Sequence, residues 1–224
     1  TVSVLQYREE GYLPEALLNY LARLGWSHGD DEKFDARQFV EWFDLGHVSH
    51  SAARFDASKL GWLNQQYMKE ADNNRLAELV QPFLQAQGID TAGRPELPGL
   101  IGLVKERVNT IEELADGLHI YFRQTLAAVD ELRAKLPKSA LPAFEKLQAE
   151  LASVAWEAPA LGQLLKDTAA AFGLKMGQIG MPLRLVLFGT AQTPSIDQIL
   201  ALLGREETLR RFAAAWPHVL AIVE

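Results

Sequence analysis

A helical spacing of apolar residues recurs along almost the whole chain and constrains its fold more than any other feature. In residues 14–25, Leu17, Leu21 and Leu24 recur at this spacing, and Leu18 widens the apolar stripe. The stretch opens with a proline and closes with a glycine, which is typical of the two ends of a helix. It is therefore predicted to be a helix that buries these four leucines.

The same pattern predicts helices along the rest of the chain. They are expected over residues 57–69, 76–88, 100–108, 141–154, 159–172 and 194–203 and from 206 onward. Asp35 is expected to cap a short helix that buries Phe39, Val40 and Phe43. Residues 182–188 alternate enough to pass for a strand, but no second strand is evident to pair with them, which favours a helix. The fold class is predicted to be all-α.

Polar residues and glycines at the expected helix ends support this prediction. Thr110 and Glu113 match a capping box for a helix that follows. Thr193 is expected to cap the helix over residues 194–203, with Pro194 at its first position. Gly204 is expected to end that helix. These signals agree with the apolar pattern around them.

Charge is distributed unevenly along the chain. The net charge is −7, which by itself argues against a nucleic-acid partner. Up to residue 135 there are 14 Lys and Arg against 21 Asp and Glu, whereas the remainder has 8 of each. The C-terminal part can therefore carry a basic face, or its cations can be spread over solvated helix surfaces. Its candidate cations are Lys166, Lys175, Arg184, Arg205, Arg210 and Arg211.

The residues alone predict neither a catalytic nor a metal site. There is no cysteine, no glycine-rich phosphate loop and no HExxH sequence. His47 and His50 are three apart, but no third ligand has a matching spacing, so both are expected on the surface. Neither a signal peptide nor an apolar run of membrane-spanning length is present. We therefore expect a cytoplasmic protein that does not bind a membrane.

Two stretches are more specific than helical periodicity. The first is residues 4–27 (VLQYREEGYLPEALLNYLARLGWS), continued by Lys59-Leu60, Trp62-Leu63-Asn64 and Tyr67. The second comprises residues 175–178 (KMGQ), 182–184 (PLR), 189–190 (GT), 193–196 (TPSI) and 199–204 (ILALLG). The chain resembles bacterial glutamyl-tRNA synthetases, which are class I aminoacyl-tRNA synthetases. The first stretch is similar to the segment after their KMSKS-type loop, and the second to their anticodon-binding end.

The resemblance implies a division into three helical regions. It predicts a tRNA stem-contact region over residues 1–72 and two anticodon-binding subdomains over residues 73–135 and 136–224. The HIGH-type and KMSKS-type motifs of the family are not in this sequence. We therefore expect an inactive fragment that holds no cofactor, with ATP and Mg²⁺ belonging to the missing catalytic domain. The expected partner is the tRNA for glutamate rather than DNA, and the fragment is expected to be a monomer.

The resemblance also implies which residues contact the anticodon. Arg107 corresponds to the arginine that contacts the third anticodon base and helps to reject the glutamine tRNA. Arg184 corresponds to the arginine that reads the middle of the anticodon; since it lies between two leucines, it must point outward or find a partner such as Asp197. Further anticodon-binding residues are expected at the N-terminus of the helix that follows. They are Thr193, Pro194 and Ile196.

Three questions stay open from the sequence. In the N-terminal part, Arg54 and Lys59 are candidates for phosphate contacts with the tRNA stem. The residues Trp26, Trp42 and Trp62 suit either the core or stacking on bases, and we expect them in the core. The alternative function is a helical protein-interaction scaffold with an apolar groove. Binding that weakens steeply with salt would favour RNA over this scaffold.

Overall fold

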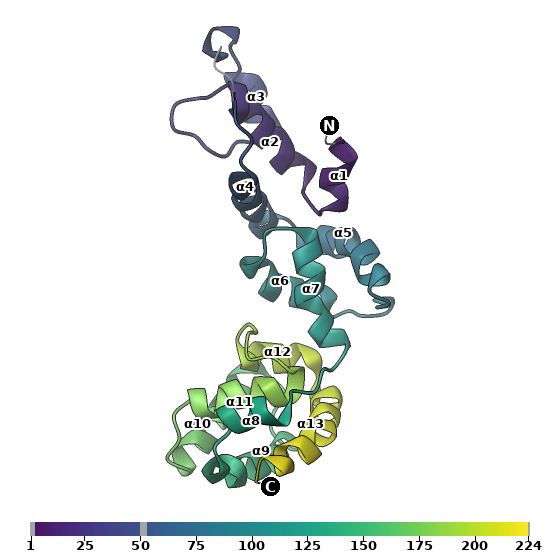
Figure 1. Ribbon diagram of the computed structural model, residues 1–224, viewed down its shortest axis with the longest axis vertical. Helices are drawn as coiled ribbons and strands as arrows, with labels where there is room; N and C mark the ends of the chain where they lie inside the picture. The colour runs from purple at the N-terminus through teal and green to yellow at the C-terminus, as the bar shows by residue number, and fades with distance from the viewer. Residues whose placement is uncertain (1–2, 50–52, 224) are drawn as a thin grey trace. The chain divides into compact units, whose positions relative to one another are not determined.

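The computed structural model describes residues 3–49 and 53–223 and divides the chain into two compact units (Figure 1). The first unit comprises residues 1–118 and the second residues 119–224. In the described part of the chain the elements are helices, and the one β pairing is an isolated bridge between Trp26 and Val48. None of the described helices is both long and apolar enough to span a membrane. The all-α prediction is therefore confirmed.

In the described residues of the first unit, seven α-helices begin. They are α1 (Val4–Glu9), α2 (Pro14–Gly25), α3 (Ala36–Trp42), α4 (Ala57–Glu70), α5 (Asn73–Ala86), α6 (Leu97–Val104) and α7 (Ile111–Phe122). Two 3-10 turns, η1 (Leu45–His47) and η2 (Lys105–Arg107), follow α3 and α6. The last residues of α7 belong to the second unit.

The second unit contains the remaining helices. They are α8 (Val129–Lys135), α9 (Leu141–Leu151), α10 (Ala158–Ala171), α11 (Gly177–Phe188), α12 (Ile196–Leu203) and α13 (Arg205–Leu220), with 3-10 turns η3 (Lys138–Ala140) and η4 (Ala221–Val223). The ambiguous residues 182–188 lie in α11, so the preference for a helix is confirmed. Although α8 falls within the predicted subdomain 73–135, it packs against α11 and α13 of the second unit.

One hydrophobic cluster of the first unit forms where α2 packs against α4. Leu17 and Tyr20 of α2 contact Leu60 and Leu63 of α4, and all four are buried. At the spacing of 3.6 residues per turn, positions 17, 20 and 24 share one helix face. Hydrophobic burial on this face stabilises the pair of helices.

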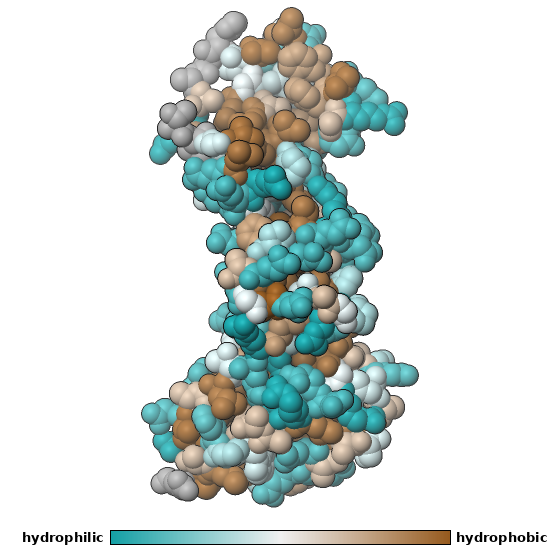
Figure 2. Space-filling view, turned by 90° about the vertical axis from the view of Figure 1, so that its right-hand side faces the viewer, coloured by the Kyte–Doolittle hydropathy of each residue, from teal (hydrophilic) through white to brown (hydrophobic). Residues whose placement is uncertain are grey.

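Four side chains that were predicted to be buried are in fact exposed. Leu18 and Leu21 of α2 are 63% and 46% exposed, because they lie one stripe away from the face that meets α4. Val40 is 78% exposed and Phe43 is 44% exposed, although Phe43 still contacts the ring of Trp26. Figure 2 shows hydrophobic side chains on the surface formed by these first helices. Apolar spacing thus locates the helices correctly but overestimates the width of their buried faces.

Two predicted caps are present. Asp35 caps α3 as part of a capping box with Gln38. The Thr110 hydroxyl accepts a hydrogen bond from the Glu113 amide at 3.1 Å, while the Glu113 carboxylate accepts one from the Asn109 amide at 2.6 Å. Backbone amides at the start of α7 therefore have side-chain acceptors, largely as the capping box predicted.

The second unit contains an arginine that is completely buried. The Nε of Arg211 donates to the carboxylate of Glu207 at 2.7 Å. Its Nη1 and Nη2 donate to the carbonyls of Ile120 and Tyr121 at 2.7 and 2.8 Å, and Nη1 also reaches the carbonyl of Leu187 at 3.4 Å. Ile120 and Tyr121 are in the last turn of α7, where carbonyls lack partners within the helix. Arg211 of α13 therefore stabilises the C-terminal ends of α7 and α11.

Because Arg211 is buried, it does not belong to the basic face that was considered for the C-terminal part. Arg211 is inaccessible to a ligand. Its neighbour Arg210 forms an ion pair with the same Glu207 carboxylate at 2.7 Å. Arg205 donates to the carbonyl of Val154. Arg205, Arg210 and Arg211 are thus held by partners within the unit, and Arg211 is in its core.

Candidate nucleic-acid interface

A polar pocket of about 450 Å³ lies between α10, α11 and α12 in the second unit. Arg184 and Ile196, two of the predicted anticodon-binding residues, line it. The pocket is also lined by residues that we did not predict to bind. Among these are Lys166 of α10, Ser195 and Asp197.

The Arg184 guanidinium is half-buried and held in a defined orientation. Its Nε donates to the Thr193 hydroxyl at 2.8 Å, and its Nη1 donates to the Gly180 carbonyl at 3.0 Å. Its Nη2 donates to the Pro194 carbonyl at 3.3 Å. These bonds fix the plane of the guanidinium, a planar group with five donors suited to recognising bases and phosphates.

The expected cap at Thr193 and Pro194 is wrong. Helix α12 begins at Ile196, with Ser195 in the capping position. The Thr193 hydroxyl accepts from Arg184 and donates to the Pro194 carbonyl at 3.1 Å, so it supports the arginine instead of capping the helix. Thr193 is 6% exposed and Pro194 is buried. The two residues therefore position Arg184 and do not form an accessible surface of their own.

Helix α11 places Arg184 at the pocket, and the C-terminal end of this helix depends on Gly189. Gly189 has a left-handed φ of 71° and donates from its amide to the Leu185 carbonyl. A Cβ at this position would lie 2.4 Å from the carbonyl oxygen of Thr125. Because both the backbone conformation and the close approach require glycine, Gly189 fixes the turn that leads to Thr193.

The charges around the pocket have opposite signs. Lys166 is exposed at its edge, and Asp197 accepts a hydrogen bond from the Ser195 hydroxyl. Two glycines leave space for these groups, since a Cβ on Gly162 would meet Asp197 at 3.3 Å and one on Gly180 would meet Arg184 at 3.2 Å. The pocket thus offers cationic donors, a carboxylate acceptor and a hydroxyl, a set that can bind the edge of a base and a phosphate.

Arg107, the other predicted anticodon-binding arginine, is exposed in η2 of the first unit. Two contacts fix this turn to the end of α4. The ammonium of the buried Lys105 donates to the Ala71 carbonyl at 2.9 Å, and the Glu106 carboxylate forms an ion pair with the Lys69 ammonium at 4.0 Å. Arg107 is therefore an accessible cation on a well-anchored turn.

The two predicted stem-contact residues lie in the first unit. Arg54 is exposed. The Lys59 ammonium forms an ion pair with Glu32 at 2.9 Å, and the same carboxylate pairs with Arg23 at 2.9 Å. Hydrogen bonding from Lys59 has the largest effect on the pKa of Glu32 and, together with the charges of Arg23 and Lys59, lowers it against the opposing effect of burial. Two cations thus share one carboxylate, which leaves a net positive charge.

The three tryptophans of the first unit differ in exposure. Trp26 is buried and contacts the rings of Phe34 and Phe39, as expected for a core residue. Trp42 is half-buried and stacks on His28 with 4.2 Å between ring centroids. Trp62 is 46% exposed, so the prediction that it belongs to the core is wrong. It lies on α4 beside Leu60 and Leu63, but on the face turned away from α2.

The predicted absence of a histidine metal site remains a prediction. His47 is exposed in η1, whereas His50 lies outside the described residues. Across residues 3–49 and 53–223, no three His, Asp or Glu side chains are grouped as metal ligands.

Two protein-family models match the chain. The model described as an anticodon binding domain matches residues 75–216, which include Arg107 and the whole pocket around Arg184. The chain belongs to the anticodon-binding domain family. A second model, the catalytic domain of class I tRNA synthetases (E and Q), matches residues 1–62. The catalytic-domain family therefore extends into the segment for which the sequence predicts stem contact.

Individual relatives are glutamate–tRNA ligases. The chain is 55% identical to the glutamate–tRNA ligase of Nitrosospira multiformis over 94% of its own length and 46% of the relative, and 49% identical to that of Dechloromonas aromatica over 95% and 46%. It thus spans about half the length of these relatives. The resemblance to bacterial glutamyl-tRNA synthetases is confirmed.

Solved structures of the same enzymes share the fold. A crystal structure of a glutamate tRNA ligase from Elizabethkingia meningosepticum, in complex with its amino acid, has a TM-score of 0.84 and 32% identity. It matches 93% of this chain and 42% of that protein. The glutamate–tRNA synthetase of Elizabethkingia anophelis has a TM-score of 0.81 and 31% identity, over 93% and 41% of the two chains.

The family resemblance identified Arg184 but did not place Lys166, Ser195 and Asp197 with it in one pocket, although Lys166 was a candidate for a basic face and Asp197 a candidate partner of Arg184. Ser195 and Asp197 directly flank Ile196 and could have been found as its neighbours. The position of Lys166 beside Arg184 had no such signal, because Lys166 comes from α10 and reaches the pocket through the packing of α10 against α11 and α12.

Proposed function

We propose that this chain is the tRNA-recognition part of a glutamate–tRNA ligase and that it binds the anticodon and stem of the glutamate tRNA. The observation that carries this proposal is the oriented Arg184 guanidinium in a polar pocket within the anticodon-binding domain match. The glutamate–tRNA ligases among its relatives favour RNA binding over a protein-interaction scaffold.

In the proposed mechanism, Arg184 reads the middle of the anticodon. Unpaired anticodon bases can turn outward and be recognised at their edges. Thr193 and Pro194 hold the guanidinium plane by accepting its hydrogen bonds, so little side-chain entropy remains to be lost on binding. Ile196 supplies an apolar wall, and Lys166 at the rim of the pocket contacts a phosphate. Phosphate contacts of this kind position the RNA, whereas base contacts provide specificity.

The first unit supplies the other proposed contacts. Arg107 meets the third anticodon base and favours the glutamate tRNA over the glutamine tRNA, which its exposure on an anchored turn supports. Arg54 and Lys59 contact phosphates of the tRNA stem, which the exposure of both residues supports. The three-region division into residues 1–72, 73–135 and 136–224 stays part of this proposal.

The complete ligase joins glutamate to its tRNA with ATP and Mg²⁺. We assign that chemistry to the ATP-site motifs of the family, which this sequence lacks. The chain alone is therefore proposed to bind tRNA as a cytoplasmic monomer without catalysing the reaction.

The test compares tRNA affinity in two charge-matched variants. Arg184→Met removes the oriented guanidinium, and the control Arg210→Met removes an arginine whose side chain is 56% exposed outside the pocket. One well-placed base contact contributes about 1–3 kcal/mol, so Arg184→Met should raise the Kd for glutamate tRNA about five- to a hundredfold. Equal small effects of the two variants would contradict base recognition by Arg184.

Arg107 has a separate test. The variant Arg107→Gln is titrated with glutamate tRNA and with glutamine tRNA beside the unchanged chain. Loss of preference for glutamate tRNA, with circular dichroism unchanged, supports its assignment. Preserved preference would remove Arg107 from the set of discriminating residues.

A further inference from the structure

Trp62 presents an aromatic surface to solvent at a position where the rest of its helix is well packed. It is 46% exposed, whereas Leu60, Leu63 and Asn64 on the same helix are buried. The side chain therefore contributes only part of its surface to the core of the first unit. An exposed indole next to polar groups is a typical platform for nucleic-acid bases.

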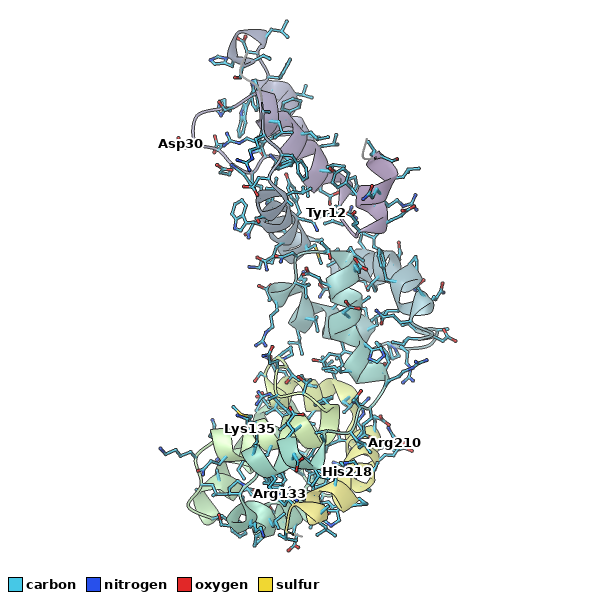
Figure 3. The ribbon with its side chains drawn as sticks, viewed as in Figure 1. Tyr12, Asp30, Arg133, Lys135, Arg210 and His218 are labelled. Atoms are coloured by element: carbon cyan, nitrogen blue, oxygen red, sulfur yellow. The ribbon has the colours of Figure 1, made fainter. Side chains whose placement is uncertain are left out.

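The exposed tryptophan lines a pocket of about 410 Å³ that is separate from the Arg184 pocket. Tyr12 comes from the turn between α1 and α2, where Figure 3 labels it, and Ser58 comes from the first turn of α4. Asn109 and Glu113 come from the start of α7. Three separate segments thus place a phenol, a hydroxyl, an amide and a carboxylate around one indole ring.

Hydrogen bonds fix the three segments to one another. The buried Asn64 accepts from the Leu13 amide at 2.8 Å and donates to the Asn109 carbonyl at 2.6 Å. The Ile111 amide donates to the carbonyl of Gly11 at 2.9 Å. A Cβ on Gly11 would lie 2.6 Å from the Glu112 nitrogen, so the turn and the start of α7 are in close contact. The pocket is therefore preformed, which reduces the entropic cost of binding a ligand.

The polar groups of the pocket suit a base rather than a phosphate. Glu113 is exposed and ionised carboxylates are acceptors only, with capacity beyond the one bond that it receives from the Asn109 amide. A carboxylate repels a phosphate but accepts from the amino group of a base. A cation lies nearby in the chain, because Lys59 follows Ser58 directly and its side chain is 43% exposed. Lys59 can contact a phosphate that flanks a bound base.

We infer that Trp62 stacks on one unpaired base of the bound tRNA, and that Glu113 and Asn109 receive the amino edge of that base. This inference rests on the proposed function, because it takes tRNA as the ligand. It adds a base-binding subsite in the first unit, apart from Arg107 and Arg184. The base carries an exocyclic amino group and is therefore adenine, cytosine or guanine.

The test separates stacking from apolar contact at one position. Trp62→Leu keeps an apolar side chain without an aromatic face, and Trp62→Phe keeps a smaller aromatic face. Phe172→Leu is the control, since Phe172 is 36% exposed in the second unit. Removal of one base–aromatic stack should raise the Kd for glutamate tRNA about five- to a hundredfold in Trp62→Leu. Trp62→Phe should recover much of this loss, and the control should bind normally.

A chemical footprint identifies the base. Dimethyl sulfate and kethoxal together modify unpaired adenine, cytosine and guanine, and the unchanged chain should protect one such base outside the anticodon. Protection should disappear in Trp62→Leu and return in Trp62→Phe. Circular dichroism of each variant checks that the helices are retained.

The outcomes distinguish this inference from the proposed function. Normal affinity and footprint in Trp62→Leu, with weakened binding in Arg184→Met, would overturn the Trp62 subsite and leave anticodon recognition standing. Equal loss in the leucine and phenylalanine variants would overturn stacking. If the unchanged chain binds no tRNA at low salt, both the proposed function and the subsite fail.

Discussion

The buried Arg211 gives the sharpest prediction about stability. Arg211→Met replaces a guanidinium that is completely buried and bonded to Glu207, Ile120 and Tyr121. Methionine is long and flexible enough to refill much of the space. The variant therefore mainly removes the ion pair and the donors to the carbonyls at the end of α7.

The expected loss follows from these contacts. Hydrogen bonds to charged groups contribute about 1.5–3 kcal/mol each, and breaking a buried ion pair costs about 3–5 kcal/mol. Restored apolar burial offsets part of the loss, while Arg210 continues to pair with Glu207. We therefore expect Arg211→Met to lower the free energy of unfolding of the second unit by about 3–5 kcal/mol.

The assay must report on the second unit by itself, because a chain with two compact units need not unfold in one step. Native-state hydrogen exchange, resolved by mass spectrometry to peptides from α11 and α13, meets this requirement. The control is Arg210→Met, which removes the exposed partner of the same carboxylate (Figure 3) and should cost at most about 1 kcal/mol. Equal losses in the two variants would refute the reasoning from burial.

Two further predictions concern the same unit. Hydrogen bonding, from Arg210 first, lowers the pKa of Glu207 to about 2 from an ordinary 4.5. The stability that the ionised carboxylate contributes is therefore present above about pH 4.5 and is lost as the pH falls toward 2. Urea unfolding of Glu207→Gln at a series of pH values should lack this acid dependence, and an unchanged dependence would contradict the assignment. Gly189→Ala should lower the free energy of unfolding of the unit by at least about 2 kcal/mol, measured by hydrogen exchange. The new Cβ would clash with the Thr125 carbonyl, and alanine disfavours the left-handed φ of this position. The control Gly173→Ala has a φ of 64° and no atom within 4 Å of the added Cβ, so it should cost only about 1 kcal/mol, and equal costs would show that the clash is relieved.

Local sequence signals predicted most of the helices. The predicted helix over residues 14–25 has the bounds of α2, because a proline in the first turn and a glycine at the end act within the segment itself. Asp35 and Thr110 also cap as expected, since each bonds to an amide only three residues away. Such features depend on few distant contacts and are therefore readable from one sequence.

Features that depend on distant contacts were not predictable in this way. Thr193 has the residue type and position of a cap, but its hydroxyl bonds to Arg184 across the pocket and the helix begins later. Arg210 and Arg211 are adjacent and chemically identical, and the packing of α13 against the other helices of the second unit determines which of them is buried. Trp62 was assigned to the core because its neighbours are apolar, although its own face of α4 is open.

The most direct test of the account is the anticodon dependence of tRNA binding. The chain is titrated with glutamate tRNA, and with the same tRNA carrying the anticodon of an unrelated tRNA, across a series of salt concentrations. The account predicts that log Kd rises linearly with log salt for both RNAs, while the altered anticodon binds at least about tenfold more weakly at every salt concentration. Equal affinity for the two RNAs would contradict anticodon recognition by this chain.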